Sequence, residues 1–126
     1  MTHTGVGASL PRKEDDRFLH GRGRYLADIE MPRMLDVAFV RSPLAHAEIV
    51  GIEKPEEAGE WVFTAHDMDG VVPIRPTSNV AGHRIIGSPP MGLTRVRFVG
   101  EIIAACLAPT RALAEDLAEQ VVPDLM

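Results

Sequence analysis

The chain has 126 residues, of which 45% are hydrophobic and 25% are charged, with a formal net charge of −5 at pH 7. These values are typical of one soluble globular domain with a modest core, and the acidic balance excludes nucleic acid and anionic membranes as expected partners. The longest uncharged run, residues 102–110, is too short to span a membrane, and the N-terminus lacks the apolar segment of a secretory signal, so we expect a cytoplasmic location.

Residues 1–11 are rich in Gly and Thr and are predicted to form an extended arm that needs a partner surface to become ordered. A charge cluster follows at residues 12–17 and leads into Phe18 and Leu19, which favours a short helical turn. The sequence GRGR at residues 21–24 could present backbone N–H groups and guanidinium groups to a phosphate, but it follows no predicted strand. A tight loop is therefore the favoured interpretation, and phosphate binding is the alternative.

Two strands are predicted in the next part of the chain. Residues 34–41 alternate apolar with mixed positions, and residues 46–53 form a second strand after a Ser-Pro break. The short connection would allow these strands to pair as an antiparallel hairpin. Residues 54–59 are predicted to form a helical turn at most, and residues 61–63 a short strand.

The apolar, β-branched runs at residues 96–99 and 102–107 predict a buried strand pair interrupted at Gly100 and Glu101. Cys106 lies inside the second run. A lone cysteine without a neighbouring His or basic residue in sequence is expected to be a buried, inert thiol rather than a nucleophile.

After Pro109 the hydrophobic pattern changes to that of an amphipathic helix. Its apolar positions recur at i, i+4 and i+8, at Leu113, Leu117 and Val121. A strand that leads into a helix is expected to be followed by a further strand that pairs beside the first one. Only residues 122–126 follow, and Pro123 is expected to prevent a strand there, because proline cannot donate to a ladder.

Residues 69–94 form the least regular part, with four prolines and four glycines among scattered apolar residues. A loop of this length in a compact domain is usually functional, disordered or packed on a partner. Its apolar content exceeds what a solvated loop needs, so we favour packing on a partner.

No complete catalytic constellation is present in the sequence. The five histidines are 17 or more residues apart, so no pair has the close spacing of a metal site. Glu101, beside Gly100, has two readings: a buried acid or base with a raised pKa, or a turn or bulge whose carboxylate accepts hydrogen bonds from loop amides. The second reading is favoured.

Three blocks, PRKEDDRFLHGRGRYLADIEMP, FVRSPLAHAEIVGIE and VRFVGEIIAACLAPTRALAEDLAEQV, occur in this order. In this order they resemble the start of the large subunit of the molybdenum hydroxylases, the family of xanthine dehydrogenase, aldehyde oxidase and aerobic carbon monoxide dehydrogenase. The resemblance implies an α+β fold, the α/β hammerhead, with a mixed sheet, one long C-terminal helix and short helical turns. It would occupy residues 12–126, truncated at its C-terminal strand, because family members continue there with an acidic strand.

The resemblance also implies a function. The chain would be a non-catalytic hammerhead subunit or domain of a molybdenum-containing hydroxylase, without catalytic, cofactor-binding or metal-binding residues of its own. It would dock on a molybdopterin-binding large-subunit polypeptide, with iron–sulfur and flavin subunits as further partners. Because the family's catalytic glutamate lies near the far end of the large subunit, Glu101 is not given that role. The candidate substrate-channel or partner-contact residues are Ile85, Met91, Leu93, Gly100 and Glu101.

Two alternatives remain open from the sequence. The chain could be a truncated, inactive domain that exposes unsatisfied apolar surface and associates with itself through an open sheet edge. It could also be an independent module that binds a small ligand or a metal ion, an interpretation that rests on the histidines and the apolar loop.

Overall fold

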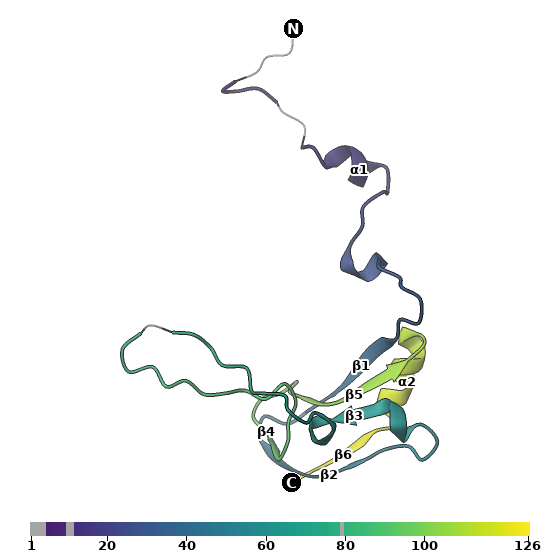
Figure 1. Ribbon diagram of the computed structural model, residues 1–126, viewed down its shortest axis with the longest axis vertical. Helices are drawn as coiled ribbons and strands as arrows, with labels where there is room; N and C mark the ends of the chain where they lie inside the picture. The colour runs from purple at the N-terminus through teal and green to yellow at the C-terminus, as the bar shows by residue number, and fades with distance from the viewer. Residues whose placement is uncertain (1–4, 10–11, 79) are drawn as a thin grey trace. The chain divides into compact units, whose positions relative to one another are not determined.

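The computed structural model describes residues 5–9, 12–78 and 80–126 (Figure 1). The chain divides into two compact units, Met1–Pro32 and Arg33–Met126. Much of the predicted N-terminal extension, at residues 1–4, 10 and 11, lies outside the described residues. The domain boundary between residues 11 and 12 therefore stays a prediction. None of the helices within the described ranges combines the length and the apolar character needed to cross a bilayer.

The first unit contains the predicted helical turn as α1 (Asp15–Leu19), followed by the 3₁₀-helix η1 (Leu26–Asp28). The ring of Phe18 stacks on that of Tyr25 with 6.0 Å between the centroids. The predicted loop turns at Gly21, whose φ is +66°. Arg22 pairs with Asp16 at 3.1 Å, so one of the two guanidinium groups considered for a phosphate already binds a carboxylate.

The second unit begins with a three-stranded antiparallel sheet in the order β1-β5-β3. It consists of β1 (Asp36–Arg41), β5 (Ile102–Ala108) and β3 (Val62–Thr64). The central strand β5 is buried at most of its positions, because it has a neighbouring strand on each side and packed layers against its faces. The apolar run at residues 102–107 is thereby confirmed as a strand.

The other sheet has the order β4-β2-β6 and is also antiparallel. It consists of β4 (Arg95–Val96), β2 (Ala47–Glu53) and β6 (Val122–Leu125). The 3₁₀-helices η2 (Gly59–Trp61) and η3 (Ala65–Asp67) flank β3. The α+β class is confirmed, and the strands form two antiparallel sheets in place of the expected single mixed sheet.

The predicted hairpin of the first two strands is wrong. β1 pairs with β5 and β2 pairs with β4 and β6, so consecutive strands belong to different sheets. The chain leaves β1 through a bulge at Val40 and Arg41, and Ser42 then hydrogen-bonds with Glu101 and Gly100 across the start of β5. The most apolar strand takes the centre of its sheet, and that choice depends on burial rather than on closeness in sequence.

Two further predictions about strands are corrected. The strand expected at residues 96–99 stops at Val96, because residues 98–100 turn, with Gly100 at a φ of +88°. Pro123 does not prevent a strand: it lies in β6, opposite Ile52 of β2. β6 is an edge strand of this sheet, and a proline is compatible with an edge because hydrogen bonds are needed on one side only.

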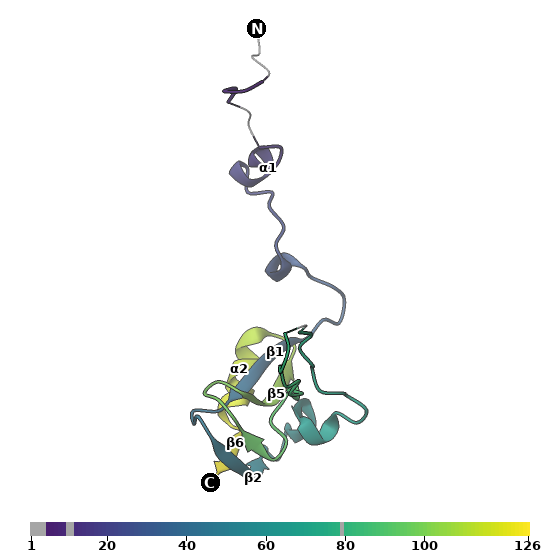
Figure 2. The same ribbon diagram turned by 90° about the vertical axis from the view of Figure 1, so that its left-hand side faces the viewer.

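The predicted helix is α2 (Arg111–Glu119), which lies beside β1 and β5 (Figure 1, Figure 2). The side chain of Thr110 caps it by accepting a hydrogen bond from the Leu113 N–H. Leu117 and Val121 are buried as expected, but Leu113 is 51% exposed and Ala114 is fully buried in its place. The buried face is therefore displaced by one position from the predicted one.

Two apolar clusters hold the unit together. The cluster beneath α2 joins both outer strands of the first sheet to β5 and the helix, through Val40, Val62, Ala104, Cys106, Leu117 and Val121. A second cluster of Ala47, Val96 and Ile103 connects β5 to the other sheet. Cys106 is fully buried, which confirms the expectation of a buried thiol, and burial raises the pKa of that thiol.

Candidate functional site

The irregular loop after η3 contains two extended legs that approach each other near Ser88. The N–H of Ile74 donates to the carbonyl of Ser88 at 2.8 Å, and the N–H of Ser88 donates to the carbonyl of Ile74 at 2.9 Å. We call residues 71–88 the arm, of which the structure describes 71–78 and 80–88. The arm leaves the sheets as the long teal-to-green loop in Figure 1.

A glycine permits the close approach of the two legs. A Cβ atom at Gly87 would lie 2.9 Å from the Cβ of Pro73, closer than real Cβ atoms come to a neighbour. Gly87 therefore lets the returning leg pass against Pro73 on the outgoing leg, beside the paired hydrogen bonds of Ile74 and Ser88.

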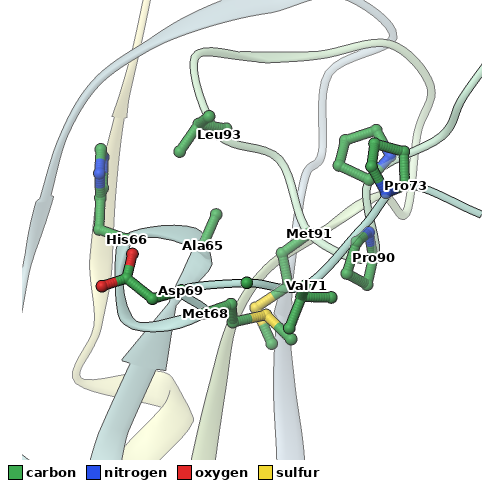
Figure 3. A pocket seen from close by; sticks show the side chains of 11 residues that line it. Ala65, His66, Met68, Asp69, Val71, Pro73, Pro90, Met91 and Leu93 are labelled. Atoms are coloured by element: carbon green, nitrogen blue, oxygen red, sulfur yellow. The ribbon is translucent and has the colours of Figure 1, made fainter.

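A pocket of about 340 Å³ opens at the base of the arm. Residues from η3 and the following turn form one wall, and Val71 and Pro73 of the arm, together with residues 89–93 that follow the arm, supply the rest. Its lining includes Ala65, His66, Met68, Asp69, Val71, Pro73, Pro90, Met91 and Leu93. In Figure 3, His66 and Asp69 stand on one side and Pro73 and Pro90 on the other, with Met68, Met91 and Val71 between them.

The chemistry of this pocket is largely apolar with one polar side. Methionine sulfur and proline rings provide polarizable and rigid apolar surface, which suits a flat, apolar molecule or side chain. His66 and Asp69 can add a hydrogen-bond donor and an acceptor at one edge. The arrangement can hold and orient a group, but it contains no nucleophile activated by a base.

The turn that carries His66 is fixed by Asp67. One oxygen of the Asp67 carboxylate accepts hydrogen bonds from the Thr64 N–H at 2.7 Å and from the Thr64 hydroxyl at 2.9 Å. Lys54 lies 3.5 Å from the same oxygen and donates to the carbonyl of Val62 at 2.7 Å. The hydrogen bonds from Thr64, helped by the charge of Lys54, lower the pKa of Asp67 below its ordinary value.

A second hollow of about 250 Å³ lies over β2 and has His66, Leu93 and Lys54 in its lining. His66 and Leu93 also line the pocket at the arm base, so the two hollows share a wall. The shared wall places Leu93 between the arm base and the second sheet.

The structure brings together some of the predicted site residues and separates others. Met91 is buried in the pocket, and Leu93 lines it at the edge. Ile85 lies on the arm and is 56% exposed, outside the lining of either hollow. Gly100 and Glu101 lie in the turn before β5 and line neither hollow. Their roles as channel or partner contacts stay predictions.

Glu101 follows the favoured reading of the sequence. It is 5% exposed, and its carboxylate accepts hydrogen bonds from the backbone N–H of Arg97 and, at 3.1 Å, from the Arg97 guanidinium. The Arg41 guanidinium donates to the Gly100 carbonyl at 2.8 Å from the end of β1. Both carboxylate oxygens thus fasten a turn, which confirms the turn with loop-amide hydrogen bonds.

One face of the first sheet carries exposed aromatic side chains. The register places Phe39 of β1 and Phe63 of β3 on either side of Ala105, so the three share one face. The two phenylalanines are 40% and 38% exposed. Val37, also exposed, and Leu107 form the next pair on this face. We call this surface the aromatic face; the opposite face is covered by α2.

Sequence reasoning missed several pocket residues, above all His66, Met68, Asp69 and Pro73. The pattern Thr-x-x-Asp at Thr64 and Asp67 was an available signal, because it predicts a capped turn that fixes the residues next to it. Within the described ranges, no group of three or more His, Cys, Asp or Glu side chains could hold a metal ion.

Known proteins are similar to this chain in both sequence and fold. Residues 20–125 match the family described as aldehyde oxidase and xanthine dehydrogenase, a/b hammerhead domain. The chain therefore belongs to this hammerhead family. The solved structure of quinoline 2-oxidoreductase from Pseudomonas putida 86 superimposes with a TM-score of 0.88 at 39% identity, over 96% of this chain and 16% of that one.

Two relatives of the hammerhead chain are named as subunits. The nicotine 6-hydroxylase large subunit of Paenarthrobacter nicotinovorans is 37% identical over 96% of this chain and 15% of its own length. The carbon monoxide dehydrogenase large chain of Hydrogenophaga pseudoflava is 33% identical over 86% of this chain and 14% of its own. The chain thus spans about one seventh of the length of these relatives.

Proposed function

We propose that this chain is the hammerhead part of a molybdenum-containing hydroxylase, which docks on a molybdopterin-binding large-subunit polypeptide and helps to shape its substrate channel. The observation that carries the proposal is the similarity to the nicotine 6-hydroxylase large subunit, which covers 96% of this chain but 15% of that protein. A domain that is a small part of each relative is expected to act together with the remainder. Iron–sulfur and flavin subunits are proposed as further partners.

The aromatic face supports docking. Phe39, Phe63 and Val37 are exposed apolar side chains on one face of an ordered sheet, and apolar surface of this kind often marks an interaction site. The guanidinium of Arg41 lies 5.4 Å from the centroid of the Phe39 ring, so the rim of this surface is cationic. An aromatic centre with a polar rim is the common anatomy of protein interfaces.

The pocket at the arm base supports a contribution to the channel. Its wall of Met68, Met91 and Pro73 suits a flat ring, and the imidazole N–H of His66 can donate a hydrogen bond to a ring nitrogen. Nicotine and quinoline, which appear in the names of two relatives, are heteroaromatic compounds. We therefore propose a heteroaromatic substrate class for the complex.

The chemistry itself is assigned to the partner. We propose this because the chain matches about one seventh of the length of its relatives, and the family resemblance puts the catalytic glutamate and most cofactor contacts in the remainder. No catalytic step is therefore assigned to this chain, and molybdopterin is expected in the partner polypeptide.

Purification of the tagged chain from its native host tests the proposal. We expect a larger, molybdenum-containing polypeptide to co-elute with the tagged chain in about equal molar amount. Iron and flavin absorbance should also be present if the further subunits are bound. A variant with Phe39→Asp and Phe63→Asp should lose the partner, whereas the control Leu113→Ser on the outer side of α2 should retain it. Isolation of the wild-type chain without any molybdenum-containing partner would count against the proposal.

The pocket also favours a second candidate, a small-ligand module that works alone. This candidate predicts that a heteroaromatic compound raises the melting temperature of the isolated chain, because a ligand that binds only the folded state stabilises it. If no compound shifts the melting temperature and a partner co-purifies from the native host, the second candidate is excluded and the first proposal is retained.

A further inference from the structure

The arm exposes far more apolar surface than its own packing uses. Its exposed large apolar side chains are Val71, Val72, Ile74, Val80, Ile85 and Ile86. Six exposed aliphatic residues within one loop form a surface that water solvates poorly, and such surfaces normally meet a partner.

The charge of the arm is opposite to that of the rest of the chain. Residues 70–100 contain no Asp or Glu, and the arm carries Arg75 and Arg84. Without these two arginines, 11 of the 13 basic residues remain against 18 acidic ones, so the rest of the chain has a net charge of −7. An apolar arm with two guanidinium groups is complementary to a groove with an apolar floor and carboxylates at its rim.

The arm is also held ready for binding. The paired hydrogen bonds of Ile74 and Ser88 join its legs, and Pro73, Pro76 and Pro89 restrict the backbone next to this junction. A binding segment that is restricted before it meets its partner loses less conformational entropy on association. Gly87 permits the junction, because any side chain there would collide with Pro73.

We propose that the arm inserts into an apolar groove, rimmed by carboxylates, on the cofactor-bearing partner polypeptide. This inference rests on the proposed function, from which it takes the identity of the partner. A partner of several times the size of this chain is indicated by the relatives, of which the chain covers 14 to 16%. Nucleic acid is disfavoured as the occupant, because the chain is acidic and the arm has two arginines.

Binding of arm variants to the co-purified, molybdenum-containing partner tests the inference. Arg75→Glu with Arg84→Glu should weaken binding by about tenfold or more at low salt. The affinity of this variant should rise with ionic strength, whereas that of the wild type should fall, because salt then screens repulsion between like charges. Ile85→Ser with Ile86→Ser should weaken binding by a similar factor without changing the salt dependence. Arg75→Lys with Arg84→Lys should restore most of the affinity, because the charges are kept.

Matched controls separate the arm from general surface effects. Leu113→Ser removes an aliphatic side chain of similar exposure, and Arg111→Glu reverses an exposed charge on α2; both should bind like the wild type. Circular dichroism and thermal melting should show all variants folded, since the arm side chains lie outside both core clusters.

The outcomes distinguish the two levels of the proposal. If the wild-type chain binds no molybdenum-containing partner, the proposed function fails. If the wild type binds the partner, and the Arg→Glu and Ile→Ser double variants of the arm bind it as tightly as the wild type does, only the arm inference is overturned. It is also overturned if the wild type forms dimers that the arm variants abolish while partner binding persists, because the occupant would then be a second copy of this chain.

Discussion

Arg97 and Glu101 are joined twice, since one carboxylate oxygen of Glu101 accepts from the backbone N–H of Arg97 and the other accepts from its guanidinium at 3.1 Å. The pair closes the turn that leads from β4 into β5. Gly100 in this turn donates its N–H to the carbonyl of Ser42, so the pair also fixes the end of β1. The sequence allowed either a catalytic or a structural interpretation of Glu101, and these contacts support the structural one.

Glu101→Ala tests this structural role. The substitution removes the acceptor of the part-buried hydrogen bond from the Arg97 N–H, and we expect a loss of about 2 kcal/mol in the free energy of unfolding. Urea denaturation of the 126-residue chain measures the loss. Glu115→Ala breaks an exposed pair with Arg111 on α2 and should change stability little. Equal effects of the two substitutions would refute the structural role of Glu101.

Asp67→Asn tests the turn that carries His66. The pKa of Asp67 is lowered by the hydrogen bonds from Thr64, so its carboxylate stabilises the fold above the ordinary pKa, and this contribution is lost as the pH falls through the lowered value. The wild type should therefore be more stable than the variant at pH 7, and the difference should shrink below about pH 4. Denaturation at several pH values measures it; a difference that does not change with pH would contradict the assignment.

Cys106 should be unreactive in the folded chain. Burial raises the pKa of its thiol, which the charge of Lys54 opposes in part, so the thiol stays protonated and out of reach of reagents at neutral pH. A thiol reagent should label it only after denaturant is added, and the lone cysteine makes the signal unambiguous.

The raised thiol pKa of Cys106 also predicts a dependence of stability on alkaline pH. The unfolded thiol ionises first, so the contribution of Cys106 is fully present below the unfolded pKa and is lost as the pH rises through the folded value. Cys106→Ala should remove this part of the alkaline destabilisation. Rapid labelling without denaturant would argue against a buried thiol.

Gly87→Ala should open the base of the arm. The added Cβ would meet the Cβ of Pro73 at 2.9 Å, so we expect the junction of Ile74 and Ser88 to separate. Hydrogen exchange should show faster exchange of these two amides, whereas the melting temperature should change little. Gly51→Ala is the matched control, because its Cβ would have no neighbour within 4 Å. Unchanged exchange at Ile74 would disprove the close packing of the legs.

The amino-acid sequence by itself determined the elements with a strong local pattern. The alternation around Phe39, the β-branched run that contains Ile103, and the helical spacing of Leu117 and Val121 all predicted the observed type of element, because their periods match those of strands and helices. The order of three sequence blocks was also sufficient to predict the hammerhead family, which residues 20–125 confirm.

Only the tertiary structure decided which strands are neighbours and which residues form the pocket. β1 joins β5 across more than 60 positions, and Pro123 enters an edge strand beside β2, since pairing follows the burial of surfaces from distant parts of the chain. Ala114 replaced Leu113 at the buried face because the axial rotation of α2 is set by the sheet beneath it. For the same reason His66 and Met91, 25 residues apart in sequence, share a pocket that no local pattern specifies.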